Sequence, residues 1–347
     1  MHPDLRLDVL IPTYNRASLL EKCVRSVLNA RTIPWLSVHI TVICNGCADG
    51  SAELVRRLQV AYPRRISLVE ERRRGKSHAL NIGIASTDGD LVGMIDDDEQ
   101  VDASWLEVVA REFLDTSVDF IGGPYRAVWP APAPPWMPAE YLAVLGSVDN
   151  GPECRTYDAS FPGMLKGGNA VIRRDVLLRV GPYAEYLGPS ERSRLFSCED
   201  EDMYWRLLKA GAHGRYLPDL VIYHYISEER LSQEYYRSWC FWRGVSRGLM
   251  DRTHPMPVTY LAGIPRFLWG EAARGLARLT ISRRRGKGQT FGDELKMWDV
   301  AGYLYGKHVY PLARFSPLKS RRLPTTPTFA ELGRQTEVER TEVELAG

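Results

Sequence analysis

The sequence contains no apolar run long enough to span a membrane. None of its uninterrupted apolar stretches approaches the roughly 20 residues that a transmembrane helix requires. Residues 1–6 also lack the apolar run of a secretory signal peptide. These two absences predict a cytoplasmic protein that does not cross a membrane, although it can still bind to the inner face of the cell membrane.

Cysteines and net charge are also scarce. Six cysteines in 347 residues are too few for a disulfide scaffold, which agrees with a reducing compartment. Cys44 and Cys47 form a CxxC pair with no evident second pair of metal ligands, so we interpret both as inert thiols. The formal net charge of +2 gives no indication of a nucleic acid partner.

The first part of the chain shows a regular alternation of apolar runs and helical spacing. Hydrophobic residues make up 44% of the chain, enough for a sizeable core. The pattern predicts strands and helices in turn at 7–11, 16–28, 38–43, 52–60, 66–69, 78–86 and 91–95. Such alternation with short connections predicts an α/β fold, in which helices cover both faces of a mostly parallel sheet.

The rest of the chain changes in character twice. Further elements are expected at 120–125, 125–129, 169–172, 174–180, 200–210 and 220–223, and the Pro-rich stretch 130–138 reads as a surface loop. From about residue 231 the pattern is helical and rich in Arg, Trp and Tyr. We therefore predict an α/β domain over 1–230, a helical region over 231–323 and a flexible polar tail over 324–347.

Three consecutive aspartates, Asp96, Asp97 and Asp98, follow the apolar run 91–95. Ligands of open parallel sheets bind beyond the carboxyl ends of the strands. In an extended chain Asp96 and Asp98 would point to the same side and could share one Mg²⁺ or Mn²⁺ ion. Such an ion would neutralise a diphosphate leaving group. A solvated acidic turn and a calcium site are the alternatives.

Several short segments occur in the order of the motifs of one enzyme family. They are 12–16 (PTYNR), 45–51 (NGCADGS), Gly75-Lys76 with Ala79-Leu80-Asn81, 96–98 (DDD), 167–169 (GGN), Glu199-Asp200 with Arg206, and His224. Over about residues 7–225 the sequence thus resembles family 2 of the inverting glycosyltransferases, which have the GT-A fold. Asn45 departs from the family pattern, which commonly has aspartate there.

The resemblance implies a GT-A catalytic domain with a nucleotide-sugar half over about 1–125 and an acceptor half over about 126–230. It implies contacts to the nucleotide-sugar from Pro12, Thr13, Tyr14, Asn15, Arg16, Asn45, Lys76, Asp96 and Asp97. The acceptor and sugar loop would comprise Gly167, Gly168, Asn169 and Glu199, together with Trp129 and Trp136. The metal ligands would be Asp98, Asp96 and His224, and the general base would be Asp200.

Several of these residues also have a plain structural interpretation. Tyr14 could stack on the base or pack at a loop mouth. The Asn45 amide can donate and accept, as a pyrimidine edge requires, which favours uracil or thymine. Lys76 could bind the diphosphate or belong to a solvated basic loop with 72–74. Asp200 could take the proton of an acceptor hydroxyl or begin a helix, and repulsion among the acids at 199–202 should raise some of their pKa values.

The aromatic residues and the late helical region leave similar alternatives. Trp129 and Trp136 could stack on a sugar or pack in the interior, and Asn169 could hold the donor sugar or position its loop. The segment 260–281 combines apolar residues with arginines. This composition fits a helix that lies on an anionic membrane, or a helix packed on the catalytic domain with a solvated basic face.

The sequence as a whole predicts a glycosyltransferase of polysaccharide biosynthesis. It would transfer a sugar, with inversion, from a UDP- or dTDP-sugar to a hydroxyl of a saccharide or lipid-linked acceptor. A nucleotidyltransferase that makes nucleotide-sugars is one alternative, but 12–16 does not resemble its Gly-rich loop. A non-catalytic nucleotide-sugar-binding protein is the other, and the DDD and Glu199-Asp200 motifs argue against it.

Overall fold

The central sheet of the protein has eight strands, and most of them run in one direction. The computed structural model describes residues 4–191, 193–285, 291–310 and 327–333. The strand order is β3-β2-β1-β4-β9-β6-β10-β8, with only β9 and β8 antiparallel to the rest. The strands are β1 (Leu5–Thr13), β2 (Leu36–Asn45), β3 (Ile66–Glu71), β4 (Leu91–Met94), β6 (Phe120–Gly122), β8 (Arg155–Tyr157), β9 (Ala170–Arg173) and β10 (Gly214–Tyr216).

Helices cover both faces of this sheet, as the sequence predicts. They are α1 (Ala17–Asn29), α2 (Ser51–Ala61), α3 (Lys76–Ala85), α4 (Trp105–Glu112), α5 (Arg174–Val180) and α6 (Glu199–Lys209). Leu7, Val9 and Ile11 of β1 pack in one core cluster with α1, α2 and α4, whereas Leu10 packs in another with α3, α5 and α6. Side chains alternate along a strand, so a strand covered on both faces must be a nearly continuous apolar run.

The observed elements confirm the predicted fold class and most of the predicted elements, with ends that differ by a few residues. Two elements that follow the aspartates, the short strand β5 (Glu99–Val101) and α4, were not predicted. The Pro-rich stretch leads into a 3₁₀ helix, η1 (Ala139–Leu145). A second 3₁₀ turn, η2 (Gly167–Asn169), occupies the place where the third late strand was expected to begin.

A small second sheet brings distant parts of the chain to the aspartates. Its order is β5-β11-β7, where β7 is Tyr125–Val128 and β11 is Ile222–Tyr225. His224 pairs with Glu99 in the antiparallel register, and the Tyr225 amide donates to the Asp98 carbonyl oxygen at 2.8 Å. The late histidine is therefore fixed beside the aspartate segment by backbone pairing.

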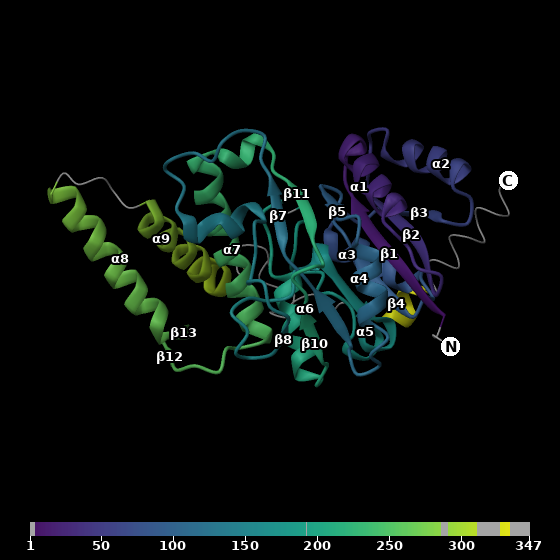
Figure 1. The fold of residues 1–347 in the computed structure, drawn as a ribbon. Helices are drawn as coiled ribbons and strands as arrows, with labels where there is room; N and C mark the ends of the chain where they lie inside the picture. The colour runs from purple at the N-terminus through teal and green to yellow at the C-terminus, as the bar shows by residue number, and fades with distance from the viewer. Residues whose placement is uncertain (1–3, 192, 286–290, 311–326, 334–347) are drawn as a thin grey trace.

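The helical region begins with the 3₁₀ turn η3 (Glu228–Leu231) and continues with α7 (Gln233–Thr253), the hairpin β12 (Tyr260–Leu261) and β13 (Ile264–Pro265), α8 (Arg266–Arg285), α9 (Phe291–Leu304) and the π-helical turn η4 (Tyr305–Val309). Figure 1 shows α8 at the end of the molecule farthest from β1–β3. Among the described residues, no helix combines the length and apolar content that a membrane span requires.

Helices α7 and α9 touch through their backbones. A Cβ atom on Gly244 or Gly248 of α7 would overlap the carbonyl oxygen of Asp299 or Tyr303, respectively. In the same way, a Cβ atom on Gly302 would overlap the carbonyl oxygen of Phe241 of α7, and one on Gly306 would overlap that of Val245 of α7. Only glycine permits this approach, which fixes α9, and α8 packed on it, to α7.

Part of the predicted flexible tail is ordered. In 327–333 the Thr328 hydroxyl accepts from the Glu331 amide at 3.3 Å, and the Glu331 carboxylate accepts from the Thr328 amide at 2.7 Å. This reciprocal capping starts a helical turn that buries Leu332 completely in the cluster with α3, α5 and α6. The predicted tail residues 324–326 and 334–347, and 286–290 and 311–323 of the predicted helical region, lie outside the described residues.

Candidate active site

The candidate site lies at the carboxyl ends of β1, β2 and β4, where the predicted motifs converge. The segment Thr13 to Arg16 leaves β1, Asn45 ends β2, and the aspartates follow β4. Pro12 is buried within β1. Parallel strands end at the same edge of a sheet, which explains why residues more than 80 positions apart meet here.

The aspartate segment forms a turn, not the extended chain that we expected. The Glu99 amide donates to the Asp96 carbonyl oxygen at 3.1 Å, so the chain reverses before β5. Asp96 accepts a hydrogen bond from Lys76 Nζ at 2.8 Å. The group of possible metal ligands that contains Asp98 does not include Asp96. The turn interrupts the alternation on which the pairing of Asp96 with Asp98 rested, and Asp96 instead contacts Lys76.

Asp98, Glu99 and His224 instead form a compact buried group. One ligand atom from each residue lies within 4.8 Å of the other two. The Nδ1–H of His224 donates to the Leu145 carbonyl oxygen at 2.9 Å, which leaves Nε2 with a lone pair facing Asp98. Two carboxylates and one neutral imidazole nitrogen suit Mn²⁺ or Mg²⁺, and a ligand histidine held through its other nitrogen is the usual arrangement. The residues therefore fit a divalent cation.

Electrostatics distinguish the two carboxylates of this group. Burial opposes ionisation of Asp98, but without a bound cation a charged His224 ring, together with Arg16 and Arg230, outweighs burial and holds the pKa of Asp98 below its usual value. Burial and the charges of Asp96 and Asp98 raise the pKa of Glu99 well above its usual value. A cation would remove this repulsion, which supports a site that is completed by positive charge.

Two arginines supply positive charge at the same place. Arg16 Nη1 lies 2.9 Å from carboxylate oxygens of both Asp97 and Asp98. Arg230 Nη2 lies 3.2 Å from Asp98, and its Nη1 donates to His224 Nε2 at 3.3 Å. Arg16 belongs to the predicted set, but Arg230 and Glu99 were missed. Glu99 could have been suspected from its place directly after the aspartates, whereas Arg230 in η3 carries no local signal.

Lys76, Glu199 and Asp200 join the aspartate turn to the start of α6. Lys76 Nζ lies 3.7 Å from Glu199 in addition to its bond with Asp96. Burial would lower the pKa of Lys76, but Asp96, Asp200 and Glu199 raise it, so the ammonium stays charged. Burial, followed by the charge of Asp200, raises the pKa of Glu199 to about 8. This agrees with the predicted effect of the acidic cluster.

Asp200 lies directly against the glycine loop. A Cβ atom on Gly167 would overlap Asp200 Oδ1, and one on Gly168 would overlap both carboxylate oxygens of Glu99. Asp200 Oδ1 is buried and has no hydrogen-bond partner within the described part of the chain. A buried acceptor without a donor is costly unless a ligand supplies one, so this oxygen is suited to an incoming hydroxyl group.

The predicted nucleotide end is organised around Tyr14 and Asn45. The guanidinium of Arg74 lies 4.0 Å above the Tyr14 ring. The Asn45 side chain donates to the carbonyl oxygens of Glu71 and Arg73 and accepts from the Gly75 amide at 2.6 Å. Its amide therefore holds the loop before α3, and its contact with a nucleotide base stays a prediction.

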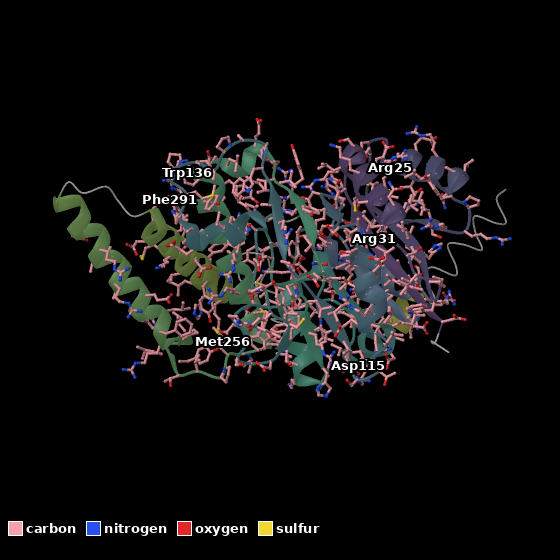
Figure 2. All side chains as sticks on the ribbon, viewed as in Figure 1. Arg25, Arg31, Asp115, Trp136, Met256 and Phe291 are labelled. Atoms are coloured by element: carbon pink, nitrogen blue, oxygen red, sulfur yellow. The ribbon has the colours of Figure 1, made fainter. Side chains whose placement is uncertain are left out.

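Three other predicted residues also have structural roles. Asn169 is buried, accepts from the Trp105 indole at 2.9 Å and donates to the Leu220 carbonyl oxygen, so it positions its loop. Trp136 packs edge-on against Tyr236 and Phe291, with 5.3 Å between ring centroids in both pairs. Figure 2 shows Trp136 and Phe291 side by side. Trp129 packs in the same cluster, and Trp136 contacts both α7 and α9 through these rings.

The Thr13 and Asn15 side chains complete the first loop. The Thr13 hydroxyl donates to Asp97 at 2.8 Å, and burial raises the pKa of Asp97 to about 6. Asn15 adopts a positive φ of 54°, and its side-chain oxygen accepts from the Ala48 amide at 2.7 Å. This bond ties the loop after β1 to the loop after β2.

Solved structures of similar fold are glycosyltransferases. The mannosyltransferase PcManGT from Pyrobaculum calidifontis, in complex with GDP-Man and Mn²⁺, superposes with a TM-score of 0.58 over 87% of each chain at 18% identity. GalNAc-T7 with UDP, GalNAc and Mn²⁺ superposes with a TM-score of 0.51 over 74% of this chain and 52% of its own. At these identities the likeness shows the fold, which is GT-A.

Similar sequences come from archaea and bacteria. Glycosyltransferase AglE of Haloferax volcanii is 28% identical over 52% of this chain, which spans 57% of the length of AglE. Glucosyl-dolichyl phosphate glucuronosyltransferase of the same organism is 26% identical over 72% of this chain and 79% of its own. Succinoglycan biosynthesis protein ExoM of Rhizobium meliloti is 26% identical over 72% and 77%.

The family described as Glycosyl transferase family 2 matches residues 8–181, half of the chain. The matched residues run from β1 to the end of α5 and so include the first loop, the aspartate turn and the glycine loop. By this match the protein belongs to glycosyltransferase family 2.

Proposed function

We propose that the protein transfers a sugar, with inversion, from a UDP- or dTDP-sugar to a hydroxyl of a saccharide or lipid-linked acceptor. The observation that carries this proposal is the buried group of Asp98, Glu99 and His224 at the carboxyl edge of the sheet. The choice of a pyrimidine nucleotide rests on the resemblance of 12–16 and 45–51 to the family pattern. The lipid-linked acceptor is supported by the relative named as acting on a glucosyl-dolichyl phosphate.

In the proposed complex, residues 1–125 hold the nucleotide-sugar and residues 126–230 receive the acceptor. Asp98, Glu99 and His224 would hold Mn²⁺ or Mg²⁺, the ion in the proposed donor complex. A bound ion of this kind neutralises charge that develops on a diphosphate leaving group. Arg16, Arg230 and Lys76 line the same region, and we assign them to the diphosphate as further positive charge.

Asp200 is the proposed base. Its unpartnered Oδ1 would accept the proton of the acceptor hydroxyl while the oxygen attacks the anomeric carbon from the side opposite the diphosphate. Because burial raises the pKa of Glu199 to about 8, this neighbour is protonated at neutral pH. It therefore adds no second negative charge beside Asp200. The reaction would take place in the cytoplasm or at the inner face of the cell membrane.

The test is release of nucleoside diphosphate from a panel of UDP-, dTDP- and GDP-sugars with Mn²⁺ or Mg²⁺. Asp98→Asn is expected to lower both the rate and the affinity for Mn²⁺. Asp200→Asn is expected to lower kcat by about 10²- to 10⁴-fold while Mn²⁺ affinity is kept. Asp88→Asn is the matched control, because Asp88 is exposed and, among the described residues, forms its ion pair with Arg6 at the other edge of the sheet.

Each outcome has a definite meaning. Metal-dependent release that Asp98→Asn abolishes supports the proposal, and inverted anomeric configuration in the product, read by NMR, supports the stereochemistry. Release that survives both substitutions contradicts the site assignment. Pyrophosphate release from a nucleoside triphosphate and a sugar phosphate would indicate a nucleotidyltransferase. Nucleotide binding without turnover on any acceptor would indicate a binding protein.

A further inference from the structure

Large apolar side chains are exposed together in one part of the helical region. Val258 and Leu261, beside and in the β12–β13 hairpin, are 42% and 59% exposed. In α8, Phe267, Trp269 and Leu276 are 41%, 42% and 60% exposed. Isolated exposed apolar residues are common on proteins, but several on one short segment call for a partner.

The geometry of α8 separates these residues from the side that packs on the protein. Leu268 and Gly275 are buried, and Met297 of α9 lies beside Gly275. Trp269 and Leu276 follow these two residues by one position each, so they project about 100° away around the helix. The Trp269 indole donates to the Leu261 carbonyl oxygen at 3.1 Å, which joins the hairpin to the helix in one surface. We name this surface, formed by Val258, Leu261, Trp269 and Leu276, the α8 face, and Phe267 is not part of it because it projects about 160° away from Trp269 around the helix.

The α8 face is bordered by positive charge. Arg266 and Arg274 are exposed and form no ion pair with any residue that the structure describes. By sequence, α8 (Arg266–Arg285) contains six arginines and one glutamate. The whole chain has a net charge of only +2, so the remainder of the protein is net acidic. Positive charge is thus concentrated at the end of the molecule that carries the exposed apolar side chains (Figure 1).

This combination fits a lipid surface better than a second copy of the chain. In a symmetric dimer the same patch meets itself, which would bring the arginines of both copies together. An anionic bilayer instead accepts the apolar side chains among its acyl chains and the guanidinium groups among its phosphates. Tryptophan and arginine suit that boundary because each has an apolar part and a polar end.

We propose that the α8 face docks on bilayers that contain anionic phospholipids. The helix lies parallel to the membrane, with Trp269 and Leu276 inserted and with Arg266, which projects about 60° from Trp269 around the helix, at the phosphate level. The rigid contact of α9 with α7 then holds the catalytic domain at a fixed height above the membrane. The proposal does not depend on the reaction, because docking needs neither donor nor acceptor.

The experiment is co-sedimentation of the full chain with vesicles of phosphatidylcholine alone or with 30% phosphatidylglycerol (a fraction of roughly this size gives a clear negative surface potential). We expect binding to the anionic vesicles that weakens as salt is raised. Replacing Trp269 and Leu276 together by glutamine should lower the partition coefficient at least about tenfold. The matched control replaces exposed Val60 of α2 and Leu178 of α5 by glutamine, which should leave the partition coefficient unchanged.

A second measurement separates insertion from surface attraction. Brominated lipids should quench tryptophan fluorescence of the bound protein, and Trp269→Phe should bind as well as the unchanged protein but lose much of the quenching. Equal melting temperatures would confirm that the variants fold. Absence of binding to anionic vesicles, or equal binding by the glutamine pair and the unchanged protein, would overturn the proposal. So would a dimer in sedimentation velocity that the glutamine pair abolishes.

Discussion

Glu199 and Asp200 are adjacent in sequence but occupy different surroundings. Glu199 is 5% exposed and faces Lys76, whereas Asp200 faces the glycine loop with one oxygen unpartnered among the described residues. A helix start makes this possible, because successive residues there point about 100° apart. The pair thus separates a protonated, structural acid from a candidate base.

Glu199 should make the stability of the protein depend on pH. Its pKa is about 8 in the folded state and ordinarily 4.5, so between these values the folded state keeps a proton that the unfolded chain has lost. The free energy of unfolding should therefore fall as pH rises through this window. Glu199→Gln mimics the protonated acid and should remove a few kcal/mol of this decline. Urea unfolding from pH 5 to 8.5 measures it.

The control for this prediction is Glu53→Gln, since Glu53 is exposed on α2. Its unfolding curves should follow those of the unchanged protein at every pH. An unaltered pH slope in Glu199→Gln would mean that Glu199 is ionised in the folded state.

At the scale of single residues, the sequence predicts the site residues that directly follow a strand, but it does not predict those that a distant element of the fold brings to the site. Asp98 and His224 stand at recognisable motif positions, and the structure places both in the ligand group. Arg230 reaches the same atoms only because η3 follows β11, which pairs with β5. Asn45 was assigned to the base because an amide can recognise a pyrimidine, but the same amide equally satisfies three backbone groups of a loop.

At the scale of elements, periodic apolar patterns predict long helices and buried strands well. The strand β1 and the helix α1 were expected within two residues of their ends because both are buried and regular. The three-residue strand β5 is too short to show a period, and its partner β11 lies more than 120 residues later. The contact between α7 and α9 was also not foreseen, because glycine in a helix ordinarily signals weakness and not packing.

Gly302→Ala should destabilise the protein through this contact. The new methyl group would overlap the Phe241 carbonyl oxygen, so α9 must move away from α7, at an expected loss of about 1–3 kcal/mol in the free energy of unfolding. Thermal and urea unfolding would report the loss. Gly50→Ala is the matched control, since a Cβ atom on Gly50 meets nothing within 4 Å and φ is −72°. Equal melting temperatures for both variants would show that the helices are not held by backbone contact.

At the scale of the whole molecule, the chain doubles back on itself. The helical region extends to one end of the molecule, whereas the turn at 327–333 lies at the other end beside β4 (Figure 1). Thr328 and Glu331 start this turn and Leu332 anchors it among α3, α5 and α6. The polar composition of the residues around this turn predicts a flexible tail. A single buried leucine changes the composition of the tail too little to predict an ordered turn.

Leu332→Ala should release this turn without unfolding the sheet. Loss of a buried leucine typically costs about 2–5 kcal/mol, but a short segment that packs on the core from outside the sheet can detach and so limit the global loss. We expect several-fold faster proteolysis within 327–333 and a small change in melting temperature. Leu178→Ala, at a 40% exposed position of α5, serves as the control. Unchanged proteolysis in Leu332→Ala would show that Leu332 does not hold the turn.

The position of Leu332 also has a consequence for folding of the protein during its synthesis on the ribosome. Leu10 and Leu332 belong to one core cluster although they lie near opposite ends of the chain. A nascent chain that has emerged only as far as α6 can form the sheet but leaves the site of Leu332 open to water and to other nascent chains. That site closes only after residue 332 has emerged from the ribosome. Slow codons before residue 327 would lengthen this interval and raise the demand for chaperones.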